Sequence, residues 1–426
     1  MALSLPVSTP TVAAPVGAWL SRYGKPAPTP ASTFWDESSV LGHHVPIELI
    51  DPRTYLERYR SWSRAKNGRA NGKSTTIAFP KVHSFLEAPE AALEASEEMV
   101  LHVLDGCEAV HLDRTKSTRV DVCAESVTTV LAKQAAQLDV HLTHAAPTDP
   151  FAAAACDAFS VPPVSGNGTS PGRMERLFRE EDRISVGVVL QETLLRLKEQ
   201  LTTERRQPSP DLIKAFGSFM GEAVHNGLDH GAGDCWLSTA VRKDLPDSLP
   251  RVELAIFNLG DTLDETIMEM PEHEPARQDI KKLQSLHQKA GYFVDGWTNE
   301  ALLVRHALQH RITKDGANER TGGVGTMKMI SCFELLVKTS RELPRCALLT
   351  GATHVRLSPR YTLERKRGSR RRPAPLRNIA FNDQNDFRLP ADRECFQTLT
   401  RRFPGTLVTL QFTLAPDHLI PREVAR

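Results

Sequence analysis

The first third of the chain alternates short apolar runs with stretches in which apolar residues recur every three or four positions. The first pattern is typical of strands and the second of amphipathic helices. The expected order is strand 76–79, helix 90–104, strand 109–113, a helix beginning near Val120, and strand 140–142. Because strands that alternate with helices need crossover connections, we expect a small α/β domain over residues 43–150.

Longer helices follow. A loop rich in Pro, Gly and Ser at 159–173 marks a boundary, and leucines at helical spacing predict a helix over 186–201. Pro208 and Pro210 end that helix, and Ser209 between them is suited to cap the next one. The elements expected after it are helix 211–229, strand 252–257, helices 279–289 and 300–310, and strand 404–412.

These patterns divide the chain into five parts. We expect a flexible arm rich in Pro and Ala (1–42), the α/β domain (43–150), a linker with the long helix (151–207), a second domain (208–415) and a tail (416–426). The predicted class is α/β throughout.

Composition indicates a cytoplasmic globular protein. Apolar residues make up 40% of the chain and charged residues 25%, and the net charge is +1, which gives no general attraction to nucleic acid or an anionic membrane. The chain has no apolar run of about 20 residues and no secretory signal pattern, so we expect no membrane association. Seven scattered cysteines without a C-x-x-C pair favour unbridged thiols in a reducing compartment.

One segment departs from this charge balance. Residues 356–377 contain nine Arg or Lys. We interpret the segment as a solvated loop inserted between strands, with a phosphate-binding or nucleic-acid-binding patch as the alternative.

Three polar residues stand along one edge of the helix expected at 211–229. Glu222, Asn226 and His230 are spaced four apart, so they project toward the same place beside an apolar stripe. Burying such groups without partners would be costly, and a polar cleft explains them better. A carboxylate can orient and deprotonate water, and an amide oxygen can bind a hard cation such as Mg²⁺.

Two glycine-containing segments follow. The strand at 252–257 ends at Asn258, and Gly260 lets a ligand approach the backbone there. A cluster formed by Gly322, Gly323, Val324, Gly325 and Thr326 then precedes a helical pattern, which suits phosphate oxygens. Its spacing fits neither the Walker A loop nor the dinucleotide-binding fingerprint.

A zinc hydrolase is an alternative interpretation. His225, His230 and Cys235 could be metal ligands with Glu222 as the base. The HExxH spacing is missing, and the sequence shows no second pair of ligands.

Taken in order, the segments at 222–230, 258–261 and 322–326 resemble the N, G1 and G2 boxes of the GHKL ATPase superfamily, which includes histidine kinases, type II topoisomerases and heat-shock chaperones. The resemblance implies an α/β sandwich in which helices cover a mixed sheet, with ATP and Mg²⁺ as cofactors. Glu222 would be the general base, Asn226 the magnesium ligand, and the G2 glycines the phosphate cradle.

The resemblance also implies a lid over 262–321. Within it, Lys314 and Arg320 carry positive charges able to reach a γ-phosphate and Gly316 can act as a hinge, with a solvated exposed loop as the alternative. Two positions depart from the family. Asn258 stands where the family has its adenine-reading Asp, and Thr262 stands where it has the second G1 glycine.

The domain at 43–150 is similar in its order of elements to STAS domains of bacterial partner-switching regulators. The acidic-Ser-Ser-Gly phosphoacceptor sequence is missing. Ser117 and Thr118 lie in the corresponding loop, and we interpret them as helix-capping residues before Val120.

Three activities follow from the resemblance. A slow ATPase whose nucleotide state controls a protein partner is favoured, a Ser/Thr kinase of the partner-switching type comes second, and a nucleotide sensor without turnover comes third. A histidine autokinase is disfavoured because the helix at 186–201 contains no histidine. A homodimer is compatible with each of these activities.

Overall fold

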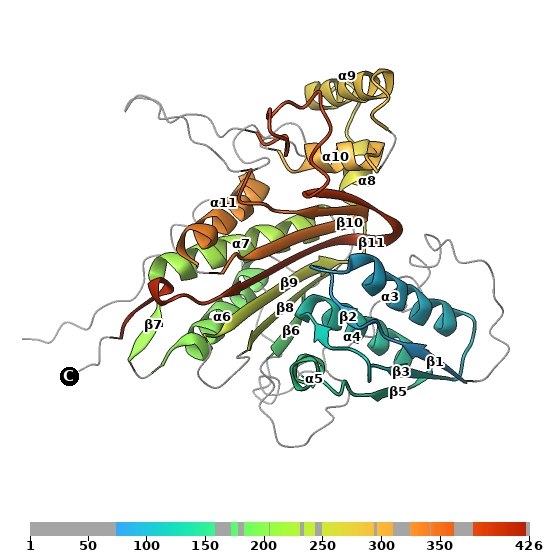
Figure 1. Ribbon diagram of the computed structural model, residues 1–426, viewed down its shortest axis with the longest axis vertical. Helices are drawn as coiled ribbons and strands as arrows, with labels where there is room; N and C mark the ends of the chain where they lie inside the picture. The colour runs from blue at the N-terminus through green and yellow to red at the C-terminus, as the bar shows by residue number, and fades with distance from the viewer. Residues whose placement is uncertain are drawn as a thin grey trace, which may run out of the picture. The chain divides into compact units, whose positions relative to one another are not determined.

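The computed structural model describes residues 74–157, 172–177, 183–203, 205–230, 234–242, 249–293, 296–309, 324–340, 342–361 and 378–422. All of them belong to one compact unit, residues 50–426. The arm predicted at 1–42 lies outside the described residues. This unit is a mixed α/β structure with several sheets (Figure 1). None of its described helices has the length and apolarity needed to cross a membrane.

The N-terminal part contains a three-stranded parallel sheet in the order β1 (Ser74–Ala78), β3 (Ala109–Asp113) and β5 (His141–Ala145). Helices α3 (Pro89–Leu104) and α4 (Val122–Gln137) form the crossover connections. The predicted order of elements is confirmed. Ile77, Val110 and Leu112 are buried in the same cluster as the apolar residues of α3 and α4.

The start of α4 differs from the prediction. Asp121 caps the helix by accepting a hydrogen bond from the Ala124 amide at 2.7 Å. The preceding residues form a short parallel pair, β2 (Val82–His83) with β4 (Arg119–Val120). The Ser117 hydroxyl is buried and donates to the Pro80 carbonyl. Ser117 and Thr118 therefore do not cap the helix, because it begins four residues after Thr118.

A five-stranded sheet follows, in the order β10 (Arg345–Arg356), β11 (Phe396–Thr413), β9 (Arg251–Asn258), β8 (Cys235–Arg242) and β6 (Gly172–Leu177). Each neighbouring pair of these described strands is antiparallel, so the prediction of a mixed sheet is wrong here. Strands β8 and β9 are consecutive in the chain, as are β10 and β11, and such neighbours favour antiparallel pairing. Strand β6 was not predicted, because Arg173, Glu175 and Arg176 interrupt its apolar pattern.

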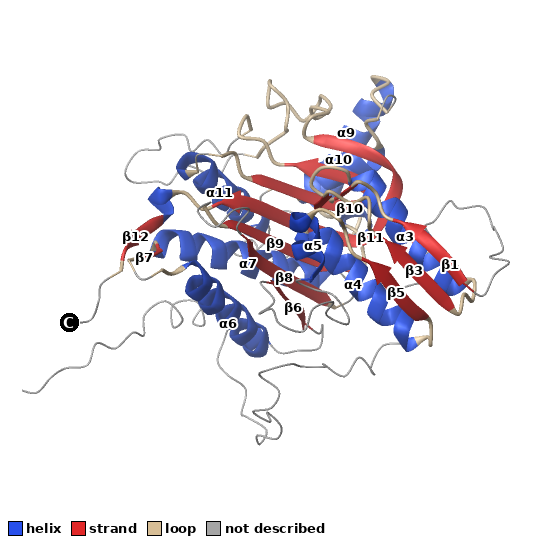
Figure 2. Ribbon diagram, turned by 60° about the horizontal axis from the view of Figure 1, so that its bottom comes forward, coloured by secondary structure: helices blue, strands red, loops and turns tan. Residues whose placement is uncertain are grey.

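Helices cover one face of this sheet (Figure 2). They are α6 (Arg183–Leu201), α7 (Pro210–His230) and α11 (Val324–Thr339). Their apolar side chains, among them Leu197, Phe219 and Phe333, share one core with Leu254 of β9. The Leu212 amide donates to Ser209 Oγ at 3.2 Å, which confirms the predicted cap of α7.

Helices α3 and α4 cover the other face. Trp236 and Phe257 of the sheet stack with ring centroids 5.3 Å apart and belong to the same buried cluster as Phe85 and α3. The Phe85 ring meets the Phe403 ring of β11 edge-on. Strand β9 is consequently buried along almost its whole length. The two helix layers thus make the five-stranded sheet the middle of the unit.

Polar contacts cross the interface between α4 and the sheet. Glu253 of β9 is buried, accepts a hydrogen bond from the Val122 amide at 3.0 Å, and pairs with Arg242. A second set links α3 to β11, where Arg401 pairs with Glu94 and Glu97. These contacts satisfy charges that the layering would otherwise bury without partners.

The remaining elements complete the unit. Helices α8 (Leu263–Met268), α9 (Pro275–Lys289) and α10 (Asn299–Ala307) lie in the chain between β9 and α11, and α5 (Pro150–Asp157) follows β5. Strand β7 (Arg206–Pro208) pairs with β12 (Leu419–Pro421), which follows the 3₁₀ turn Pro416–His418. The segment expected to be a tail therefore returns to the fold. All seven cysteines are buried and outside disulfides.

Asp121 makes stability depend on pH. Burial raises the pKa of its carboxyl group to about 6, and the nearby charge of Glu253 adds to the effect. An unfolded aspartate has already lost its proton at that pH, so the native state is progressively destabilised as pH rises from about 4 to 7. Wild type should therefore lose up to about 3 kcal/mol relative to Asp121→Asn over this range. Urea unfolding at several pH values measures the difference, with the exposed Asp139→Asn as control. A difference independent of pH would contradict the assignment.

Candidate functional site

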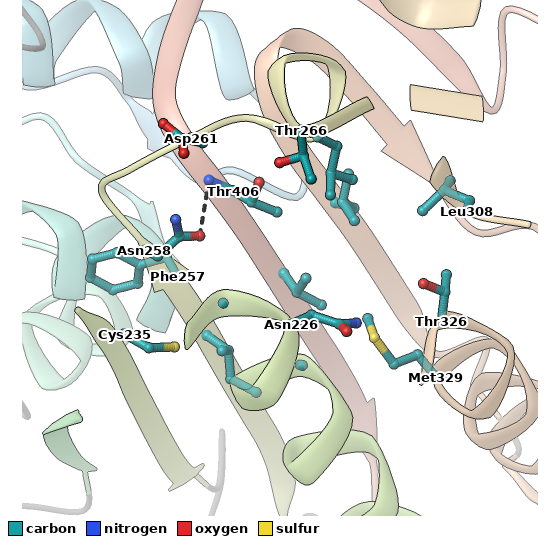
Figure 3. A pocket seen from close by; sticks show the side chains of 16 residues that line it. Asn226, Cys235, Phe257, Asn258, Asp261, Thr266, Leu308, Thr326, Met329 and Thr406 are labelled. Carbon is teal, nitrogen blue, oxygen red and sulfur yellow. Dashed lines mark hydrogen bonds between the residues drawn. The ribbon is translucent and has the colours of Figure 1, made fainter. Parts of the chain in front are cut away.

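A cavity lies where the C-terminal half of α7 meets the ends of the central strands and the start of α11 (Figure 3). Its wall is mostly apolar, with a few polar side chains directed into it, as in small-molecule sites generally. The lining residues that carry polar groups are Asn226, Cys235, Asn258, Asp261, Thr266, Thr326 and Thr406.

Gly227 brings α7 close to the sheet. A Cβ atom at this position would lie 3.0 Å from Cys235 Sγ and 4.0 Å from Asn258 Cβ. A larger residue would push the helix away from β8 and β9. The close approach places Asn226, the preceding residue, at the cavity beside the end of β9.

Strand β11 closes the cavity against the turn that follows β9. Gly405 has φ of +149°, and a Cβ atom there would lie 2.0 Å from the Asn258 carbonyl oxygen. The Gly260 amide donates to the Pro404 carbonyl at 3.1 Å. Asn258 Oδ1 in turn accepts a hydrogen bond from the Thr406 amide at 3.3 Å, which fixes this buried carboxamide at the cavity wall (Figure 3).

Predicted site residues from three distant segments of the sequence lie together in the structure. Asn226 of α7, Asn258 at the end of β9 and Thr326 of α11 all line the cavity. Gly260 lies in the turn that β11 contacts. Val324 opens helix α11.

Glu222 has a different place. It lies on α7 one turn before Asn226, but within the described residues it is not part of the cavity wall. Its carboxylate forms an ion pair with Lys328 Nζ of α11. No pattern in the sequence indicated a role for Lys328.

Other predicted residues cannot be located relative to the cavity. Lys314, Gly316, Arg320, Gly322 and Gly323 lie outside the described residues, as do the side chain of His230 and most of the basic segment at 356–377. The described residues of that segment, 356–361, continue from the end of β10, and β11 follows the segment in the chain, as expected for an insertion between strands.

Several cavity residues were missed from the sequence. Asp261 and Thr266 follow the turn after β9, Leu308 follows α10, and Thr406 belongs to β11. Asp261 was the most accessible to prediction, because it stands three residues after Asn258 in the same turn. Thr406 and Leu308 become neighbours of Asn226 through pairing and packing that no local pattern encodes.

Helix α10 of the predicted lid forms hydrogen bonds and an ion pair with the sheet. Glu300 of α10 accepts hydrogen bonds from the Ala352 amide at 2.6 Å and from Thr353 Oγ1 at 3.0 Å, and it pairs with Arg402. The fully buried Arg305 donates to the carbonyls of residues 387 and 389. Burial lowers the pKa of Arg305 to about 9, so it remains a cation at neutral pH. Helix α10 is therefore held against β10, β11 and the segment that precedes β11.

The cavity offers oxygen donors suited to a hard cation. The Asn226 amide and the Thr326 hydroxyl, at the same end of the cavity, are of the type that Mg²⁺ prefers. The zinc interpretation fits less well. Burial raises the pKa of the Cys235 thiol far above its usual range. The described residues hold no group of three His, Cys, Asp or Glu side chains able to bind a metal ion.

Comparisons with protein-family models, with curated proteins and with solved structures found no match for this chain.

Gly405 should be intolerant of a side chain. Gly405→Ala forces a Cβ atom onto the Asn258 carbonyl in a conformation that disfavours alanine, and it should cost more than about 1 kcal/mol of unfolding free energy. Gly106→Ala is the matched control, because Gly106 also has positive φ but open space around a Cβ atom. Chemical denaturation compares the two variants. Equal losses would show that the contact with Asn258 has no effect of its own.

Proposed function

We propose that the cavity binds a nucleoside triphosphate with Mg²⁺, in the manner of GHKL ATPases, and that its nucleotide state controls a protein partner. The observation that carries this proposal is the convergence of three segments more than 30 residues apart in sequence on one cavity. The resemblance to nucleotide-binding boxes requires these segments to share one site, so their convergence supports the proposal.

The polar groups suggest how a nucleotide would lie. Asn258, Asp261 and Thr406 stand together at one end of the cavity and offer hydrogen-bonding groups to a base edge (Figure 3). Asn226 and Thr326 stand at the other end, beside the first turn of the 16-residue helix α11. Phosphates would gain there from the positive end of the helix dipole and from amides that the first turn leaves without partners.

The departure from the family pattern at Thr262 has a physical explanation. Thr262 stands at the position of the second G1 glycine and caps α8. Its hydroxyl accepts from the Glu265 amide, while the Glu265 carboxylate accepts from the Thr262 amide at 2.9 Å. This capping box replaces a flexible glycine turn with a fixed helix start.

The departure at Asn258 also has a physical explanation. As a neutral carboxamide it can be buried at lower cost than an aspartate, and Asp261 supplies a carboxylate at the same end of the cavity. The base-reading role is thus shared between a buried amide and a nearby acid.

Hydrolysis would use Glu222. A water oxygen would bond to the γ-phosphorus, the bond from that phosphorus to the bridging oxygen would break with its electrons passing to ADP, and Glu222 would take the proton of the water. Because Glu222 is engaged by Lys328, we favour slow turnover. The same pair favours a second candidate, a nucleotide sensor without turnover. For the kinase alternative, Ser117 is a poor acceptor because it is fully buried.

Asn226 tests the role of the ion. Asn226→Ala should abolish Mg²⁺-dependent binding of ATP and ADP, since it removes the proposed magnesium ligand from the cavity wall. Isothermal titration with and without EDTA measures this, and the exposed Asn299→Ala is a control for loss of an amide. Tight Mg²⁺-dependent binding by Asn226→Ala would remove the central role of this residue.

Glu222 tests the chemistry. Glu222→Gln should leave nucleotide binding nearly intact and lower phosphate release by about a hundredfold or more, as expected when a general base is lost. Gln can still accept a hydrogen bond from Lys328, so the fold should persist. Equal rates of phosphate release from wild type and variant would favour the sensor without turnover.

A further inference from the structure

The ion pair between Glu222 and Lys328 joins the two helices that flank the cavity. Helices α7 and α11 pack against each other. Each contributes residues to the cavity wall, Ala223 and Asn226 from α7 and Thr326 and Met329 from α11. Glu222 precedes Ala223 and Lys328 precedes Met329, so the pair stands directly beside the wall on both helices.

The pair is placed where it can open. The Glu222 side chain is 19% exposed and the Lys328 side chain 32%, so solvent reaches both charges. A partly exposed pair of this kind can break and re-form in contact with solvent.

We propose that Lys328 is a positioning residue that holds the Glu222 carboxylate away from the nucleotide, and thereby keeps hydrolysis slow. The inference rests on the proposed nucleotide function. In the described structure the Lys328 ammonium group is paired with the Glu222 carboxylate. For hydrolysis, that carboxylate would have to face the attacking water.

The chemistry of the lysine side chain suits this role. Its flexible stem and single charge let it release and recapture Glu222 without moving either helix. Hydrolysis would then proceed only while the pair is open. Such an arrangement gives a long-lived triphosphate state, which a partner can read.

The test separates binding from turnover. Lys328→Met should raise kcat for phosphate release by about tenfold, because Glu222 becomes available as a base. The Kd for a non-hydrolysable ATP analogue with Mg²⁺ should stay within about threefold of wild type. Lys328→Arg should retain the low rate, since it keeps the cation. The exposed Lys338→Met, on the same helix, is the matched control.

A double variant shows whether the gain passes through Glu222. Lys328→Met combined with Glu222→Gln should fall to the rate of Glu222→Gln alone. An unchanged or lowered kcat in Lys328→Met, with binding intact, would overturn the positioning role and leave the proposed function standing. A gain that survives in the double variant would also overturn it. Failure of wild type to bind the analogue would overturn both proposals. Thermal unfolding of each variant confirms that the fold is retained.

Discussion

The structure depends on burying both faces of the five-stranded antiparallel sheet. Helices α6, α7 and α11 cover one face, while α3 and α4 of the N-terminal layer cover the other. A single residue shows how closely the two layers are joined, because Glu253 in the centre of the sheet accepts the Val122 amide at the start of α4. With both faces covered, the end of β9 and the middle of β11 are held firmly enough to form a cavity wall. The candidate site thus depends on a layer that contributes no residue to it.

Much of this arrangement could be predicted from local patterns. The N-terminal strands and helices, helix α7 and its Ser209 cap follow from apolar spacing and helix-end chemistry. These features are encoded within a few residues of where they occur. The meeting of Asn226 and Asn258 is different, because it was expected only from the family resemblance, and Gly227 permits the close approach of helix and strand.

Features that depend on distant pairing could not be predicted. Strand β6 carries Arg173, Glu175 and Arg176, and it forms by pairing with β8 rather than by its own apolar pattern. Thr406 reaches the cavity because Gly405 lets β11 pass against Asn258. Lys328 looks like an ordinary exposed helix residue until α11 packs on α7. In each case the partner lies at least 58 residues away in sequence. The position of a partner in space, rather than the residue type, determines the role.

Hydrogen–deuterium exchange with and without a non-hydrolysable ATP analogue and Mg²⁺ tests the central claim most directly. Binding in the cavity should slow exchange in three separate stretches, residues 222–230, 258–263 and 324–330, while 141–157 in the N-terminal layer should exchange as before. Protection of all three together would locate the nucleotide where the three segments meet. Unchanged exchange in these stretches at saturating analogue, or protection confined to another part of the chain, would contradict the account.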